Sequence, residues 1–312
     1  MPKRLLLIGS RGFIGGGLVT HFGSCKEYEF EQCDVIGDES IPKMHIVDRM
    51  APDFRSVFRA GAFDVCINCS GSASVSKSFS DPDQDFRLNV DNTQLILEAA
   101  RREAPRCRIV NISSAAVYGQ PVKAKPLREY DETKPISPYG FHKLVAEKLC
   151  EEYSTIFSIP TSTVRVFSAF GPGLRKQIFW DLYQRFRDNP EIVTLFGTGE
   201  EKRDFIYISD VAAAIEAVIE NANSRHEVFN VASGQSVSIR VVAETFAHVR
   251  GFRGQIRFSG EVREGDPTSW YADVSRLHSL GFKVKNTLWE GLSRYSAWAD
   301  GMEEDGSSRV RL

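Results

Sequence analysis

A tyrosine and a lysine stand four residues apart in the segment ISPYGFHKLVAEKL, residues 136–149, whose apolar spacing predicts a helix. Residues four apart on a helix share one face, so Tyr139 and Lys143 can act on the same substrate. An ammonium group beside a phenol favours the phenolate, which makes the phenol a better proton donor and acceptor near neutral pH. The same spacing is also common on helices without a catalytic role, so other motifs must distinguish the two interpretations.

A glycine motif near the start of the chain suits a dinucleotide. In LLLIGSRGFIGGGL, an apolar run predicts a buried parallel strand, and Gly9, Gly12 and Gly15 follow it in the spacing G-x-x-G-x-x-G and open a segment of helical character. Such glycines form a tight turn and let the backbone approach a pyrophosphate at the helix N-terminus. The candidate cofactor contacts in this loop are Gly9, Arg11, Gly12, Phe13, Ile14 and Gly15.

Two charged residues bear on which dinucleotide binds. Asp34 lies near the end of the second expected strand, YEFEQCDV, where a carboxylate accepts hydrogen bonds from the adenine ribose and favours NAD. Arg11 favours NADP, because a guanidinium pairs with its additional phosphate. The weak strand pattern also leaves Glu29, Glu31 and Asp38 as alternatives to Asp34. We expect NAD as the cofactor, with NADP as the alternative.

The elements that must position these residues follow an alternating pattern. Short apolar runs recur as KMHIV, FDVCINC, CRIVNIS, TSTVRVF and VFNVA, with helical patterns between them. This alternation predicts an α/β fold with a Rossmann-type doubly wound parallel sheet, and glycine-rich, charged segments after residue 167 indicate a smaller C-terminal substrate-binding lobe. The expected divisions are a dinucleotide-binding domain over 1–166 that also receives about 205–232, a lobe over 167–204 and 233–300, and a frayed tail over 301–312.

Composition excludes several classes of protein. The chain has 312 residues, a formal net charge of -2 and 42% hydrophobic residues, which is typical of a globular enzyme and not of a protein that binds nucleic acid or an anionic membrane. The only C-x-x-C pair, Cys66 and Cys69, has no second ligand pair near it, so we expect no metal site and free thiols in a reducing compartment. No apolar run is long enough for a signal peptide or a membrane span, so we expect a cytoplasmic protein.

A pair of serines, Ser113 and Ser114, ends the expected strand CRIVNIS. The carboxyl edge of an open α/β sheet is where ligands bind, although serines also form turns there.

Together, the segments GSRGFIG, SSAAVYG and SPYGFHK resemble the extended short-chain dehydrogenase/reductase family of nucleotide-sugar epimerases, dehydratases and reductases. FRLNVDNTQLILEAAR, GTGEEKRDFIYISDVAAAI and VREGDPTSWYADVSRLHSLGF extend the resemblance to about residues 3–300.

The resemblance implies a catalytic triad of Ser114, Tyr139 and Lys143. Tyr139 would be the acid/base at a sugar hydroxyl, and Ser114 would hydrogen-bond the same oxygen. Lys143 would bind the nicotinamide ribose hydroxyls and lower the pKa of Tyr139. Two further cofactor contacts are implied: Asp48 at the adenine and Asn89 near the nicotinamide half.

Substrate contacts and departures from the family pattern lie mostly in the lobe. Arg203, Arg263 and Asp266 match residues that hold the nucleotide diphosphate and ribose. Ser168 stands where the epimerases commonly have an Asn that contacts the substrate phosphates, and Lys176 lies in a basic segment that can shape a different pocket. The family's dehydratases have acidic residues directly after the Ser114 position, where this chain has Ala115 and Ala116, so dehydration is disfavoured.

We therefore expect an enzyme that acts at C4 of a nucleotide-activated hexose, as an epimerase through a 4-keto intermediate. One alternative is an NAD(P)H-dependent reductase of a nucleotide-linked 4-keto-6-deoxyhexose, favoured by Arg11 and Ser168. Another is a non-catalytic dinucleotide-binding regulator, which the complete triad disfavours. The resemblance also implies a homodimer through helices at about 85–103 and 138–157.

Overall fold

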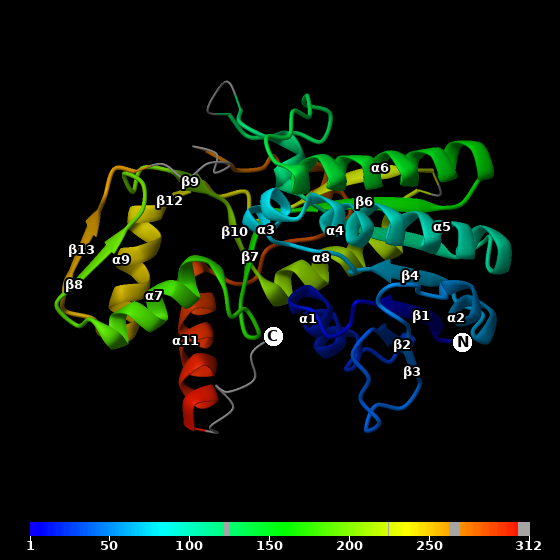
Figure 1. Ribbon diagram of the computed structural model, residues 1–312, viewed down its shortest axis with the longest axis horizontal. Helices are drawn as coiled ribbons and strands as arrows, with labels where there is room; N and C mark the ends of the chain where they lie inside the picture. The colour runs from blue at the N-terminus through cyan, green and yellow to red at the C-terminus, as the bar shows by residue number, and fades with distance from the viewer. Residues whose placement is uncertain (122–124, 224, 262–268, 305–312) are drawn as a thin grey trace.

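Seven parallel strands form the central sheet of the computed structural model, which describes residues 1–121, 125–223, 225–261 and 269–304 (Figure 1). The order across the sheet is β11 (Glu227–Val231), β6 (Thr161–Val166), β5 (Arg108–Ser114), β4 (Val65–Asn68), β1 (Lys3–Ile8), β2 (Tyr28–Asp34) and β3 (Met44–Ile46). Each of the apolar runs singled out in the sequence forms one of these strands. The doubly wound parallel sheet expected from the sequence is confirmed.

The sheet is buried on both faces because alternate residues of its strands enter two separate cores. Leu5 and Leu7 of β1 pack with α1 (Phe13–Phe22) and α8 (Ile208–Asn221). Leu6 and Ile8 pack on the other face with α2 (Phe54–Ala60), α5 (Asn92–Glu103) and α6 (Pro138–Phe157). All four side chains are at most 2% exposed. This two-sided burial explains why the strand appears in the sequence as a continuous apolar run.

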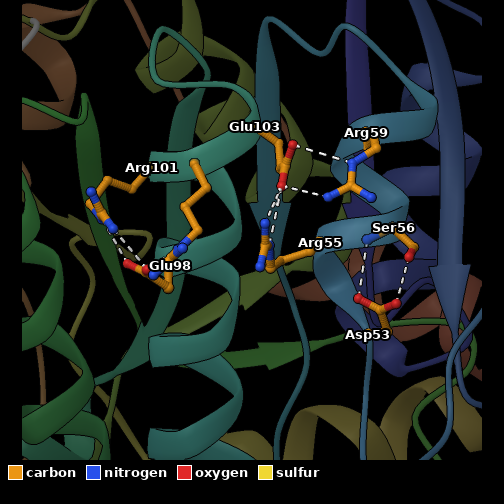
Figure 2. Close-up of polar contacts among 8 residues, drawn as sticks. Asp53, Arg55, Ser56, Arg59, Glu98, Arg101 and Glu103 are labelled. Carbon is orange, nitrogen blue, oxygen red and sulfur yellow. Dashed lines mark hydrogen bonds and ion pairs between the residues drawn. The ribbon is translucent and has the colours of Figure 1, made fainter.

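Ion pairs connect the outer surfaces of α2 and α5 (Figure 2). Glu103 of α5 accepts hydrogen bonds from Arg55 at 2.8 Å and Arg59 at 2.9 Å, and these bonds lower the pKa of Glu103 to about 2. Asp53 caps α2 by accepting a hydrogen bond from the backbone N–H of Ser56. Such solvent-exposed pairs contribute little to stability, so the buried face of α5 determines its position.

A π-helical turn interrupts the helix expected over 85–103. The segment begins as α4 (Pro82–Phe86), passes through the π-helical turn η1 (Arg87–Asp91) and continues as α5. Asp81 caps α4 by accepting from the N–H of Gln84 at 3.0 Å, and Pro82 occupies the first turn. A π turn inserts a residue and changes the direction of the side chains that follow, a feature frequent at functional sites.

The C-terminal lobe lies beside the sheet (Figure 1). Its main helices are α7 (Gln177–Asp188), α9 (Ile239–Arg250) and α11 (Leu288–Glu304), and β8 (Ile192–Leu195) pairs with β13 (Gln255–Phe258). The rings of Phe179, Phe246 and Tyr295 meet in its core. The frayed tail expected over 301–312 starts too early, because α11 continues through Glu304. The other expected domain limits stay a proposal.

Two short strand pairs connect the sheet to the lobe. β7 (Ser168–Phe170) pairs with β10 (Phe205–Tyr207), and β9 (Lys202–Arg203) pairs with β12 (Val237–Ser238). Buried Asp204, between β9 and β10, accepts from the N–H groups of Ser233, Gly234 and Ala272. The remaining elements are α3 (Val75–Ser80), the 3₁₀ turn η2 (Ala115–Tyr118) and α10 (Ser275–Ser279). Among the described helices, none has the length and apolar character needed to cross a bilayer.

Candidate active site

The loop between β1 and α1 is shaped to receive an anionic group. Gly9 has a φ of 82°, and a Cβ added to Gly15 would lie 2.1 Å from the carbonyl oxygen of Gly9, so this turn requires glycine at both positions. Gly12 caps α1 without a side-chain hydrogen bond, which leaves the first-turn N–H groups, including those of Phe13 and Ile14, facing the loop. These features fit the pyrophosphate of a dinucleotide.

Acidic side chains dominate the far end of this loop. Asp34, the last residue of β2, accepts from the N–H of Arg11 at 2.8 Å and from the N–H of Val35 at 2.7 Å. The guanidinium of Arg11 pairs with Asp38 at 3.3 Å. Arg11 is therefore engaged by a carboxylate, and the site fits the ribose hydroxyls of NAD better than the additional phosphate of NADP.

The Ser, Tyr and Lys of the expected triad meet at the carboxyl edge of the sheet. Ser114 ends β5 and caps the 3₁₀ turn η2 by accepting from the N–H of Ala116 at 3.2 Å. Tyr139 and Lys143 lie in the first two turns of α6, and the hydroxyl of Ser114 is close enough to the Tyr139 phenol to lower its pKa. The Nζ of Lys143 donates to the carbonyl of Ile112 at 3.0 Å and lies 6.0 Å from the centre of the Tyr139 ring.

Burial controls the ionisation of this pair. It raises the pKa of Tyr139 to about 12, against the hydrogen bond from Ser114, and it lowers the pKa of Lys143 to about 8. The pKa of Tyr139 is thus raised, whereas the family resemblance implies that Lys143 lowers it. Desolvation disfavours the phenolate form of Tyr139, and it also disfavours the ammonium form of Lys143. The phenol is thus protonated in the structure as it stands.

The π-helical turn places an unsatisfied amide next to this site. The side-chain nitrogen of Asn89 donates to the carbonyl of Asp85 at 3.1 Å, whereas its buried Oδ1 has no hydrogen-bond partner among the described residues. A Cβ added to Gly71 would lie 2.4 Å from that oxygen. Asn89 can therefore accept from a ligand. Asp48, by contrast, is exposed and uses Oδ1 to accept from the N–H groups of Met50 and Ala51.

The expected substrate contacts come from the lobe. Arg203, which is mostly buried in β9, stacks its guanidinium 5.8 Å from the ring centre of Trp270. Ser168 begins β7, and Lys176 caps α7. Arg263 and Asp266 lie outside the described residues, so their expected roles stay predictions.

Sequence reasoning missed a second cation near Lys176. Burial lowers the pKa of Lys176, and the charge of Lys77 lowers it further. Lys77 lies in α3, which follows the carboxyl end of β4, whereas Lys176 lies in the lobe. Two positive charges that act on each other are stabilised by an anionic group nearby. The available signal in the sequence was the position of Lys77 after a parallel strand, where ligand contacts are common.

A buried network behind the triad also escaped sequence reasoning. Glu147, two turns beyond Tyr139 on α6, accepts from Arg165 at 2.7 Å and from the hydroxyl of Ser113 at 2.5 Å. Arg165 also donates to the carbonyl of Glu129 at 3.0 Å and lies over the ring of Tyr118. Since Ser113 directly precedes Ser114, this network fixes the strand end that carries the triad serine.

Comparisons of the sequence and of the structure with known proteins lead to the same family. The chain matches the model of the family described as NAD dependent epimerase/dehydratase over residues 5–232. It is 27% identical to an uncharacterized UDP-glucose epimerase of Bacillus subtilis (96% of this chain, 98% of that one) and 28% identical to a putative UDP-glucose 4-epimerase of Methanocaldococcus jannaschii (94% and 97%). The structure of UDP-glucuronic acid 4-epimerase from Bacillus cereus, in complex with UDP-glucuronic acid and NAD, matches with a TM-score of 0.86 at 25% identity, covering 96% of this chain and 99% of that one.

Proposed function

This chain belongs to the NAD dependent epimerase/dehydratase family, and on that premise we propose that it inverts C4 of a nucleotide-activated hexose through a 4-keto intermediate. The observation that carries the proposal is the meeting of Ser114, Tyr139 and Lys143 at the sheet edge beside the glycine loop. NAD is the cofactor, in agreement with the acidic residues around Arg11. Because two of its relatives are named as UDP-glucose epimerases, a UDP-hexose is the first substrate to test.

In this mechanism the chain moves one proton and holds one cofactor. NAD, when bound, accepts a hydride from a sugar carbon and returns it. Tyr139 must first lose its own proton, a loss that the positive charge of a bound NAD would favour. The phenolate can then take the proton of the C4 hydroxyl as the carbonyl forms, and the phenol gives it back when C4 is reduced from the other face. Ser114 hydrogen-bonds the same sugar oxygen. Lys143 holds the nicotinamide ribose, and Asn89 offers its free oxygen on that side of the site.

The lobe would hold the nucleotide end of the substrate. Arg203 and Lys176, with Lys77 from α3, supply cations for a diphosphate, and the Arg203 guanidinium lies over the ring of Trp270. Ala115 and Ala116 occupy the buried turn after Ser114 and have no proton to donate or accept. Elimination of water from the sugar needs an acid and a base, so the two alanines at these positions support epimerisation over dehydration.

This proposal is tested by identifying the bound cofactor and by measuring whether turnover consumes it. The purified protein is denatured, the released nicotinamide nucleotide is identified by mass, and the native protein is assayed with UDP-, dTDP- and GDP-hexoses. We expect retained NAD and interconversion of C4 epimers without net oxidation or reduction of cofactor. An empty site, with NADPH oxidised only when a 4-keto-6-deoxy sugar is supplied, would instead establish a reductase.

We also propose that two copies of the chain associate through α5 and α6. The outer face of α6 exposes Phe141 (54%), Val145 (39%) and Ile156 (67%), three apolar side chains spaced along one stripe. Light scattering should give a dimeric mass, and Val145→Asp should shift it toward the monomer because a charge would enter an apolar interface. A monomeric mass for the unmodified protein would contradict the proposal.

A further inference from the structure

A buried aspartate and a partly buried histidine lie beside the acid/base pair. Asp85 of α4 is 3% exposed, and its Oδ2 lies 2.6 Å from Nδ1 of His142. His142 is the residue before Lys143 on α6, so the pair joins the two helices within one turn of both Tyr139 and Lys143. Figure 1 shows α3 and α4 next to the first turns of α6.

The pair is unevenly satisfied. Oδ1 of Asp85 is buried without a hydrogen-bond partner among the described residues, so the contact of this carboxylate with His142 is made through Oδ2 alone. The imidazole packs edge-on against Phe86, with ring centres 5.2 Å apart, which fixes its orientation. The His142 side chain is 14% exposed, against 3% for Asp85, so water reaches the imidazole more readily than it reaches the carboxylate.

The charge of Asp85 reaches both catalytic side chains. It raises the pKa of Tyr139 in the same direction as burial does, and it opposes the burial that lowers the pKa of Lys143. A carboxylate at this place therefore disfavours the phenolate and favours the ammonium. When His142 is protonated, the pair is neutral and this influence is reduced; when His142 is neutral, the full negative charge acts on the site.

Several other charged groups around α4 and α6 form ion pairs of their own. Asp83 pairs with Arg87 at 3.1 Å on the surface, and Glu147 pairs with Arg165. Glu98 of α5 pairs with Arg101 near the opposite end of α6, and Lys77 of α3 acts on Lys176. Burial raises the pKa of Cys69 and of Cys150 to about 12, so both thiols are neutral at working pH.

We propose that Asp85 and His142 are positioning residues for the acid/base pair, and that the protonation state of His142 sets the charge that Asp85 presents to Tyr139 and Lys143. The electrostatic coupling is a property of the structure alone, whereas its catalytic consequence rests on the proposed function. The arrangement adds an ionisation to the pH dependence that the Ser, Tyr and Lys of the triad do not supply.

The first test follows turnover against pH. His142→Asn retains a donor near the Nδ1 position but cannot take up a proton, so Asp85 keeps its full charge at low pH. The ratio of the wild-type kcat to the variant kcat should be about threefold to tenfold larger at pH 6 than at pH 9, because about one pKa unit of charge interaction is removed. Lys148→Gln, an exposed change on the same helix, should give a ratio independent of pH.

The second test needs no substrate. The six histidines are labelled with carbon-13, and His142→Asn identifies the resonance of His142. Asp85→Asn should lower the pKa read from that resonance by about one unit, and Lys143→Met should raise it because a neighbouring positive charge is lost. If neither variant moves the resonance, or if the kcat ratio is flat with pH, the inference is wrong. Resonance shifts in a protein that turns over no sugar would uphold the coupling and count against the proposed function only.

Discussion

Replacing Tyr139 with Phe should lower kcat for sugar interconversion by about a thousandfold while leaving the content of bound NAD unchanged. The substitution removes only the phenolic oxygen, and general acid/base catalysis contributes roughly 10²–10⁴-fold to such reactions. The ring is 8% exposed and keeps its packing at the head of α6. Initial rates with the best sugar from the substrate panel, together with the mass of the released nucleotide, measure both quantities.

Tyr153 offers a matched control on the same helix. It is 6% exposed, and its hydroxyl lies 3.4 Å from Glu98, at the end of α6 away from the triad. Tyr153→Phe should therefore change kcat by less than about twofold, because it removes one weak hydrogen bond from a residue outside the site. A Tyr139→Phe enzyme with nearly wild-type turnover would exclude Tyr139 as the acid/base and reopen the possibility of a non-catalytic regulator.

Replacing Arg165 with Met should destabilise the protein by about 3–5 kcal/mol, because it leaves the carboxylate of Glu147 buried without its counter-charge. Both side chains are at most 6% exposed, and Arg165 supplies three hydrogen bonds to Glu147 and one to the Glu129 carbonyl. The free energy of unfolding from urea titration, compared at equal m-value, measures the loss.

Two further variants separate charge from packing. Lys148→Met, which removes an ion pair that is 69% exposed on the lysine side, should cost less than about 1 kcal/mol. The double variant Glu147→Leu with Arg165→Met should recover much of the stability, because a buried pair can be replaced by apolar side chains at little cost. A single Arg165→Met variant as stable as the wild type would mean that Glu147 takes up a proton or reaches water.

The sequence by itself determined the sheet and the residues that meet at its edge. Apolar runs such as LLLI and CINC are local patterns, and they are typical of strands that are buried on both faces of a parallel sheet. The glycine loop is equally local, since Gly9 and Gly15 are required by a φ value and a close backbone contact within one turn. Tyr139 and Lys143 share a face by helical period alone.

Only the tertiary structure decided how these residues ionise and which groups support them. The pairs Asp85–His142 and Glu147–Arg165, and the influence of Lys77 on Lys176, join different elements of the fold. The π turn holds the side chain of Asn89 buried beside them. The pKa of Tyr139 could not be predicted from its spacing to Lys143, because desolvation depends on every element packed around the phenol. Local periodicity fixes which side chains share a face, whereas the strength of a charge depends on how much water the whole fold removes from it.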